Sequence, residues 1–169
     1  MPISASVIRG DMYDAMVEQS AQSGVFGHGY TYSSHPVACA VSLKTLEIYE
    51  RDDIFGHAAN IGEYMQAKMQ TFKDHPLVGE IRGKGMIGAI ELVANKQTGQ
   101  AFSDPSVGYF LTQACQDHGL IIRVVAGFSA AFCPPLIITK DQVDEIMSKF
   151  GKALDDTLAY VTKQNLFIA

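Results

Sequence analysis

The sequence predicts a mixed α/β fold in which amphipathic helices pack against short strands. Apolar residues recur at steps of three and four within 37–51, 54–72 and 143–158, the spacing that places them on one face of a helix. Between residues 77 and 133, short apolar runs alternate with glycines and polar turns, which is typical of strands. Hydrophobic residues make up 47% of the 169 residues and charged residues 18%, so the chain can bury a core.

The composition excludes several functional classes. The formal net charge is −5 and lysines and arginines do not cluster, so nucleic acid is not an expected partner. No apolar run approaches the roughly 20 residues that cross a membrane, and the first residues lack the order of a signal peptide. The three widely spaced cysteines fit a reducing cytoplasm, and the histidine spacing predicts no metal site.

The first residues favour a strand followed by a short helix. Residues 2–9 carry small and β-branched side chains that predict a short buried strand, and Asp11 is the expected cap of a helix that ends near Ser20. Chain ends usually lie at the surface and fray, so a buried strand at the very start suggests a truncated chain.

A glycine-rich loop around residues 24–36 precedes the next helix. Its glycines let the backbone approach a ligand closely, residues 30–34 all carry hydroxyl groups, and Pro36 suits the first helical position. Such a loop can cradle an anion such as a phosphate. From spacing alone, a serine-capped helix without a ligand is the simpler interpretation, because the loop matches neither common nucleotide-binding motif.

Two helical stretches follow, with a restart at Asp52 and Asp53. The second carries a stripe of apolar side chains at Ile54, Ala58, Ile61, Met65, Met69 and Phe72. We interpret this stripe as core packing rather than a cofactor contact. Together the two stretches predict a long connecting helical segment.

Strands then alternate with helices. Residues 77–82 and 86–93 flank Gly83-Lys84-Gly85 and predict a hairpin, in which Glu91 is an edge or solvent-facing carboxylate rather than a catalytic one. A polar turn at 95–100 leads to a helix that begins after Asp104-Pro105 and closes at Gly119.

One charged side chain interrupts the next apolar strand, residues 120–125. Arg123 must pair with a carboxylate, extend to the rim of the core, or face a ligand cavity, since an isolated buried charge is costly. A return strand over 130–133 follows, and Thr139-Lys140-Asp141-Gln142 has the form of a capping box before a final amphipathic helix.

The ordered set of motifs resembles a known family. The set comprises Gly27-His28-Gly29-Tyr30-Thr31-Tyr32, His35-Pro36, Arg82-Gly83-Lys84-Gly85-Met86, Ile90-Glu91-Leu92-Val93, Ile122-Arg123 and Pro134-Pro135-Leu136 with Thr139. Together they resemble the C-terminal part of a class III pyridoxal-phosphate-dependent aminotransferase, most closely an omega-amino acid or amine:pyruvate transaminase. The likeness covers essentially the whole chain and favours a ligand-binding loop over a ligand-free one.

The resemblance implies a fold-type-I homodimer. Residues 1–35 would be a remnant of the large cofactor-binding domain, 36–75 the connecting helical segment and 76–169 the small C-terminal α/β domain. Tyr30 and Thr31 match residues that hold the phosphate of pyridoxal 5'-phosphate across the dimer interface. Arg123 matches the mobile arginine that binds the carboxylate of an amino or keto acid and swings away for an amine.

The resemblance also implies that no catalytic residue lies in this chain. The family's Schiff-base lysine precedes a sequence that matches Pro2-Ile3-Ser4-Ala5, so it would lie upstream of Met1. We therefore expect a fragment of an enzyme that transfers an amino group from an amine or omega-amino acid to pyruvate or another keto acid, inactive alone. The alternatives are a non-catalytic remnant or interaction domain that docks on a full-length relative, and a fragment of an acetylornithine or 4-aminobutyrate transaminase.

Overall fold

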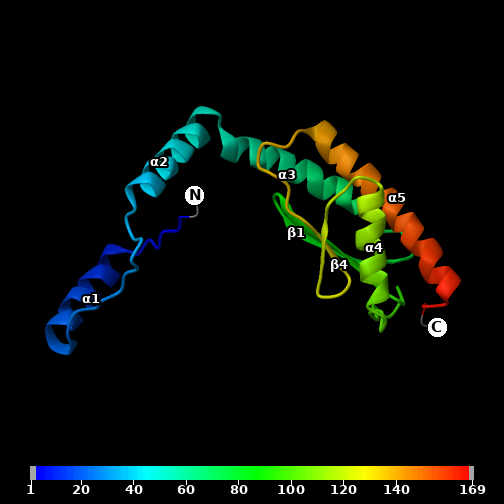
Figure 1. Ribbon diagram of the computed structural model, residues 1–169, viewed down its shortest axis with the longest axis horizontal. Helices are drawn as coiled ribbons and strands as arrows, with labels where there is room; N and C mark the ends of the chain where they lie inside the picture. The colour runs from blue at the N-terminus through cyan, green and yellow to red at the C-terminus, as the bar shows by residue number, and fades with distance from the viewer. Residues whose placement is uncertain (1–2, 168–169) are drawn as a thin grey trace. The chain divides into compact units, whose positions relative to one another are not determined.

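The computed structural model describes residues 3–167, which form two compact units that meet between Asp52 and Asp53 (Figure 1). The first unit contains two helices, α1 (Gly10–Ser23) and α2 (Pro36–Arg51). The second contains three helices and four strands, which are α3 (Ile54–Gln70), β1 (Val78–Lys84), β2 (Ile87–Leu92), α4 (Ser106–Asp117), β3 (Arg123–Val125), β4 (Ser129–Phe132) and α5 (Lys140–Gln164). This order of elements confirms the predicted mixed α/β class.

The strand predicted at residues 2–9 is wrong for the residues that the structure describes. Residues 3–9 have no regular secondary structure and are exposed. A strand needs a hydrogen-bonding neighbour, and the described part of this unit contains only helices and loops. The helix begins at Gly10 with Arg9 as its N-cap, while Asp11 lies in the first turn and accepts two bonds from the Arg9 guanidinium, at 3.0 and 2.6 Å.

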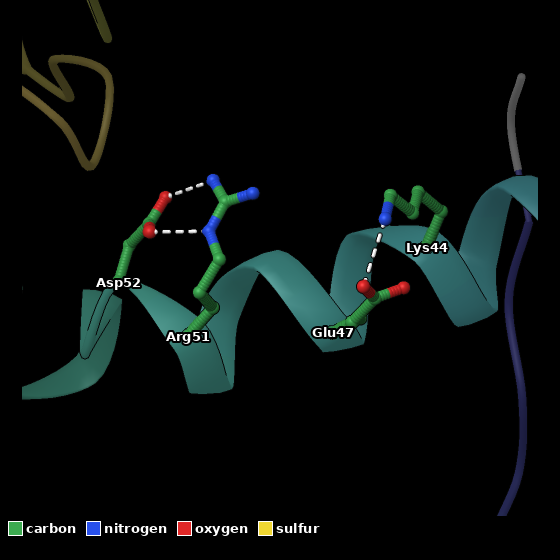
Figure 2. A network of polar contacts seen from close by, with 4 residues as sticks. All are labelled: Lys44, Glu47, Arg51 and Asp52. Carbon is green, nitrogen blue, oxygen red and sulfur yellow. Dashed lines mark hydrogen bonds and ion pairs between the residues drawn. The ribbon is translucent and has the colours of Figure 1, made fainter.

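The helix α2 begins at Pro36 as predicted, but no serine caps it. His35 is the N-cap and its side chain makes no capping bond, while Ser34 has a positive φ of 58°. Toward its end α2 carries two exposed ion pairs, Lys44 with Glu47 at 2.8 Å and Arg51 with Asp52 at 2.7 Å (Figure 2). The two hydrogen bonds between Arg51 and Asp52 lower the pKa of Asp52 and raise that of Arg51.

The predicted restart at Asp53 is confirmed. Asp53 adopts a left-handed conformation with φ of 45°, and its carboxylate accepts a hydrogen bond from the Gly56 N–H, so it caps α3. The apolar stripe of α3 is buried as expected, at Ile54, Ile61, Met65 and Met69. This helix therefore packs as part of the second unit.

The four strands form one antiparallel sheet in the order β1-β2-β4-β3. The predicted hairpin is confirmed: β1 and β2 pair around a tight turn in which Gly85 has a φ of +57°. Along β2, Gly88, Ile90 and Leu92 are buried, while the alternate residues are exposed or half-buried. One face of the sheet therefore contacts the helices, and the other, here called the outer face, is open in the second unit.

The helices α3, α4 and α5 bury the inner face of the sheet, and α5 packs against both other helices. The predicted capping box is present: the Thr139 hydroxyl accepts a bond from the Gln142 N–H, and the Gln142 side chain accepts one from the Thr139 N–H. Gln66 joins α3 to the hairpin, because its amide donates to the carbonyls of Gly85 and Ile87 at 2.9 and 3.0 Å.

The strand predicted over 120–125 is shorter than expected. Only Arg123–Val125 is a strand, and Ile121 is 90% exposed rather than buried. The register sets residues 123–125 against 131–129 of β4, so an extension would set residues 120–122 against 134–132. Pairing stops there because β4 ends at Phe132, just before Pro134 and Pro135, which carry no N–H donor.

Candidate functional site

The loop that carries Tyr30 and Thr31 is an exposed turn in the first unit. The Ser33 N–H donates to the Tyr30 carbonyl at 2.9 Å, and the Tyr30 N–H donates to the Ser33 hydroxyl at 3.0 Å. Tyr30 is 77% exposed, and its ring meets His28 edge-on at 5.4 Å. This turn fixes the local backbone while its other polar groups face solvent.

Thr31 is one of the residues of this turn whose hydrogen-bond donors are unpaired within the described chain, together with Tyr32 and Ser34. Neither the hydroxyl nor the main-chain N–H of Thr31 bonds to any residue that the structure describes, and its side chain is exposed. A hydroxyl and an N–H that are both unpaired can donate together to the oxygens of a phosphate. The donor set at Thr31 therefore fits a phosphate group.

Arg123 lies on the edge strand β3 of the second unit, exposed to solvent. It borders a cleft of about 450 Å³, which is lined mainly by apolar side chains: Leu120, Ile122, Pro134, Pro135, Ile146 and Met147. It also borders a smaller cleft of about 380 Å³ beside Tyr109 and Thr112. A charged group at the edge of an apolar cleft suits a small ligand with one anionic end.

Arg123 differs from the other arginines in having no carboxylate partner. The sequence contains four arginines. Arg9 pairs with Asp11, Arg51 with Asp52, and Arg82 with both Glu80 and Glu91. Within residues 3–167, Arg123 makes no hydrogen bond or ion pair. Its guanidinium is thus available to a carboxylate from outside the described chain.

Polar residues to which the sequence analysis gave no functional role share the outer face with Arg123. The register places Arg82, Ala89, Ala131 and Arg123 in one row across the four strands. Beside this row, Arg82 contacts Glu91 at 2.5 Å and the buried Ser129 hydroxyl at 3.3 Å. Sequence analysis did not place Arg82 and Ser129 at the site, because only the strand register brings them together.

The prediction of Glu91 as an edge or solvent-facing carboxylate is confirmed in its second part. The carboxylate is on the outer face of the sheet, as a solvent-facing group, but β2 is an inner strand and not an edge. Its hydrogen bond is the main reason that the pKa of Arg82 is raised. Glu91 therefore serves as an ion-pair partner in this structure.

Among the described residues, the exposed thiol of Cys133 lines the larger cleft. In the described part of the chain, no lysine lines either cleft beside Arg123. Lys68 pairs with Asp144 at 2.8 Å, which raises the pKa of Lys68, the opposite of what a reactive amine needs. Burial raises the pKa of Cys115 to about 11, so this thiol is a poor nucleophile.

The fold is that of a transaminase. The structure superposes on the omega transaminase from Pseudomonas jessenii in complex with PMP with a TM-score of 0.84 and 41% sequence identity, over 92% of this chain and 34% of that chain. A second solved structure, described as a transaminase with L-ala, gives a TM-score of 0.85 at 40% identity, over 91% of this chain and 36% of that chain. The mixed α/β fold is thus confirmed as a portion of a pyridoxal-phosphate-dependent transferase.

The sequence comparisons identify the family. The model of the family Aminotransferase class-III matches residues 1–154, and the chain belongs to this family, whose members depend on pyridoxal phosphate. The putrescine–pyruvate aminotransferase of Pseudomonas aeruginosa is 43% identical over 162 residues, which cover 95% of this chain and 34% of that protein. Gamma aminobutyrate transaminase 3, chloroplastic, of Solanum lycopersicum is 39% identical over 158 residues, which cover 93% of this chain and 30% of that protein.

The chain therefore spans about a third of the length of the relatives it matches. None of the helices among residues 3–167 is long and apolar enough to cross a membrane.

Proposed function

We propose that this chain supplies the phosphate-binding and carboxylate-binding residues of an aminotransferase that moves an amino group from an amine or omega-amino acid to a keto acid such as pyruvate. The observation that carries the proposal is Arg123, the one arginine in the described chain without a carboxylate partner. Its position on the rim of an apolar cleft suits a small acid with an apolar body.

When bound, pyridoxal phosphate supplies the electron sink for breaking and forming bonds at the amine carbon. The Thr31 hydroxyl and N–H would donate to its phosphate oxygens, with Tyr30 beside them. Arg123 would bind the substrate carboxylate through paired N–H donors and orient it. The proposal assigns this chain no covalent step, so alone it transfers no amino group.

The arrangement that we propose is a homodimer in the cytoplasm, with Tyr30 and Thr31 facing the cofactor phosphate of the other subunit. Residues 1–35 would belong to the large domain, 36–75 to the connecting segment and 76–169 to the small domain. A 4-aminobutyrate-type substrate is a second candidate, because the aminobutyrate relative matches nearly as closely as the putrescine relative.

The carboxylate role of Arg123 is testable by nitrogen-15 NMR of the arginine side chains. Only four arginines give Nε–Hε signals, so each is assigned by substitution. We expect pyruvate to shift the Arg123 signal saturably, acetone to leave it unchanged, and Arg51, already paired with Asp52, to be unaffected by either. The same small shift at all four arginines would contradict the proposal.

A further inference from the structure

Two arginines and two glutamates lie on the outer face of the sheet, and one of the two arginines forms ion pairs with both glutamates. Arg82 contacts Glu80 at 3.0 Å and Glu91 at 2.5 Å, while Arg123 contacts neither. These glutamates are the carboxylates that the described sheet strands carry, so one arginine holds both. This distribution leaves the positive charge of Arg123 uncompensated on this face.

Glu91 is close enough to reach Arg123 if Arg82 were absent. The two residues lie on β2 and β3, which flank β4, and their positions differ by two residues along the strands. With strands about 4.8 Å apart and about 3.4 Å per residue, their Cα atoms are roughly 12 Å apart. Extended side chains place the glutamate carboxylate about 4 Å and the guanidinium about 6 to 7 Å from Cα, so the two groups come within hydrogen-bonding distance when both side chains lie along the sheet surface instead of perpendicular to it.

Nothing bulky stands between them on the outer face. The residues of β4 on this face are Ser129 and Ala131, whose side chains are short. Arg82 also donates to the Ser129 hydroxyl at 3.3 Å, so its guanidinium is anchored on the side of Glu91 that faces β4. The Arg82 guanidinium therefore lies on the side toward which Glu91 would have to turn to reach Arg123.

We propose that Arg82 is a positioning residue for carboxylate recognition, because it holds Glu91 and so keeps Arg123 unpaired. The inference rests on the proposed function of Arg123. Without Arg82, Glu91 becomes an internal competitor that occupies the Arg123 guanidinium in place of a substrate carboxylate.

Two readouts on the Arg123 Nε–Hε signal at pH 7 test this proposal: the change in its chemical shift when Glu91 is replaced by glutamine, and its response to pyruvate. In the R82Q background we expect E91Q to shift the signal, and we expect R82Q to lower the pyruvate affinity about two- to five-fold, as for an exposed ion pair. In the wild-type background E91Q should leave the signal unchanged, and R82Q/E91Q should regain the wild-type affinity. R82K should resemble the wild type, since lysine keeps the charge that holds Glu91.

The matched control is R51Q, which removes an arginine from an exposed pair on α2 (Figure 2) and should leave both readouts unchanged. An R82Q signal that E91Q does not shift would overturn the positioning role, whatever the response to pyruvate. A loss of affinity that E91Q does not restore would also overturn it. A shift of the R82Q signal by E91Q, with no pyruvate response in the wild type, would support the pairing and reject the carboxylate role of Arg123.

Discussion

Replacing Phe150 with alanine should lower the free energy of unfolding of the second unit by about 3 to 5 kcal/mol. The Phe150 side chain is fully buried where α5 meets the sheet and α3. Its ring meets Phe72 edge-on at 5.4 Å and Phe132 edge-on at 5.1 Å. The substitution loses both aromatic contacts and leaves a cavity between α5, β4 and the turn that follows α3.

Urea denaturation followed by circular dichroism would measure this loss. The control is Tyr109→Ala, which removes a 78% exposed ring from α4 and should change the free energy of unfolding by less than about 0.5 kcal/mol. Equal unfolding midpoints for the two variants would show that α5 does not pack on the sheet as described.

Replacing Gly62 with alanine should destabilise the second unit by roughly 1 to 2 kcal/mol, although alanine is the better helix former. A Cβ at Gly62 would lie 2.7 Å from the backbone of Gly85, in the turn between β1 and β2. That turn is held by Gln66, whose amide donates to two of its carbonyls, so it cannot move away freely.

The control for this prediction is Gly151→Ala, another glycine inside a helix. A Cβ there would meet only the Phe72 ring, at 3.3 Å, and a side chain can adjust where a backbone cannot. We expect the free energy of unfolding to stay unchanged or to rise by up to about 1 kcal/mol. Stabilisation by both substitutions would mean that α3 does not approach the hairpin closely.

The elements that sequence alone predicted are those whose signal is local. The stripe of α3, the hairpin at Gly85 and the capping box at Thr139 each depend on residues a few positions apart. Two strand predictions failed, in addition to the helix caps expected at Asp11 and at a serine before α2. Residues 3–9 and 120–122 have strand-like composition, but a strand also needs a partner, and no local pattern shows whether one exists.

At the candidate site too, the features with a local sequence signal were predicted and those that depend on distant strands were not. Arg123 stood out in the sequence as a charge in an apolar run, and it borders an apolar cleft. Its relation to Arg82, 41 positions earlier, follows only from the register of four strands. The roles of Tyr30, Thr31 and Arg123 toward cofactor and substrate stay predictions, drawn from the family and fitted by the unpaired donors at Thr31 and Arg123.

The central claim is that this chain recognises the cofactor phosphate and the substrate carboxylate but carries no covalent step. The most direct test is to incubate the purified chain with pyridoxal phosphate, reduce it with borohydride and locate any adduct by mass spectrometry, with an assay for amine and pyruvate turnover alongside. We expect no turnover and at most scattered adducts on surface lysines. A stable adduct at a single lysine, together with turnover of an amine and pyruvate, would contradict the claim.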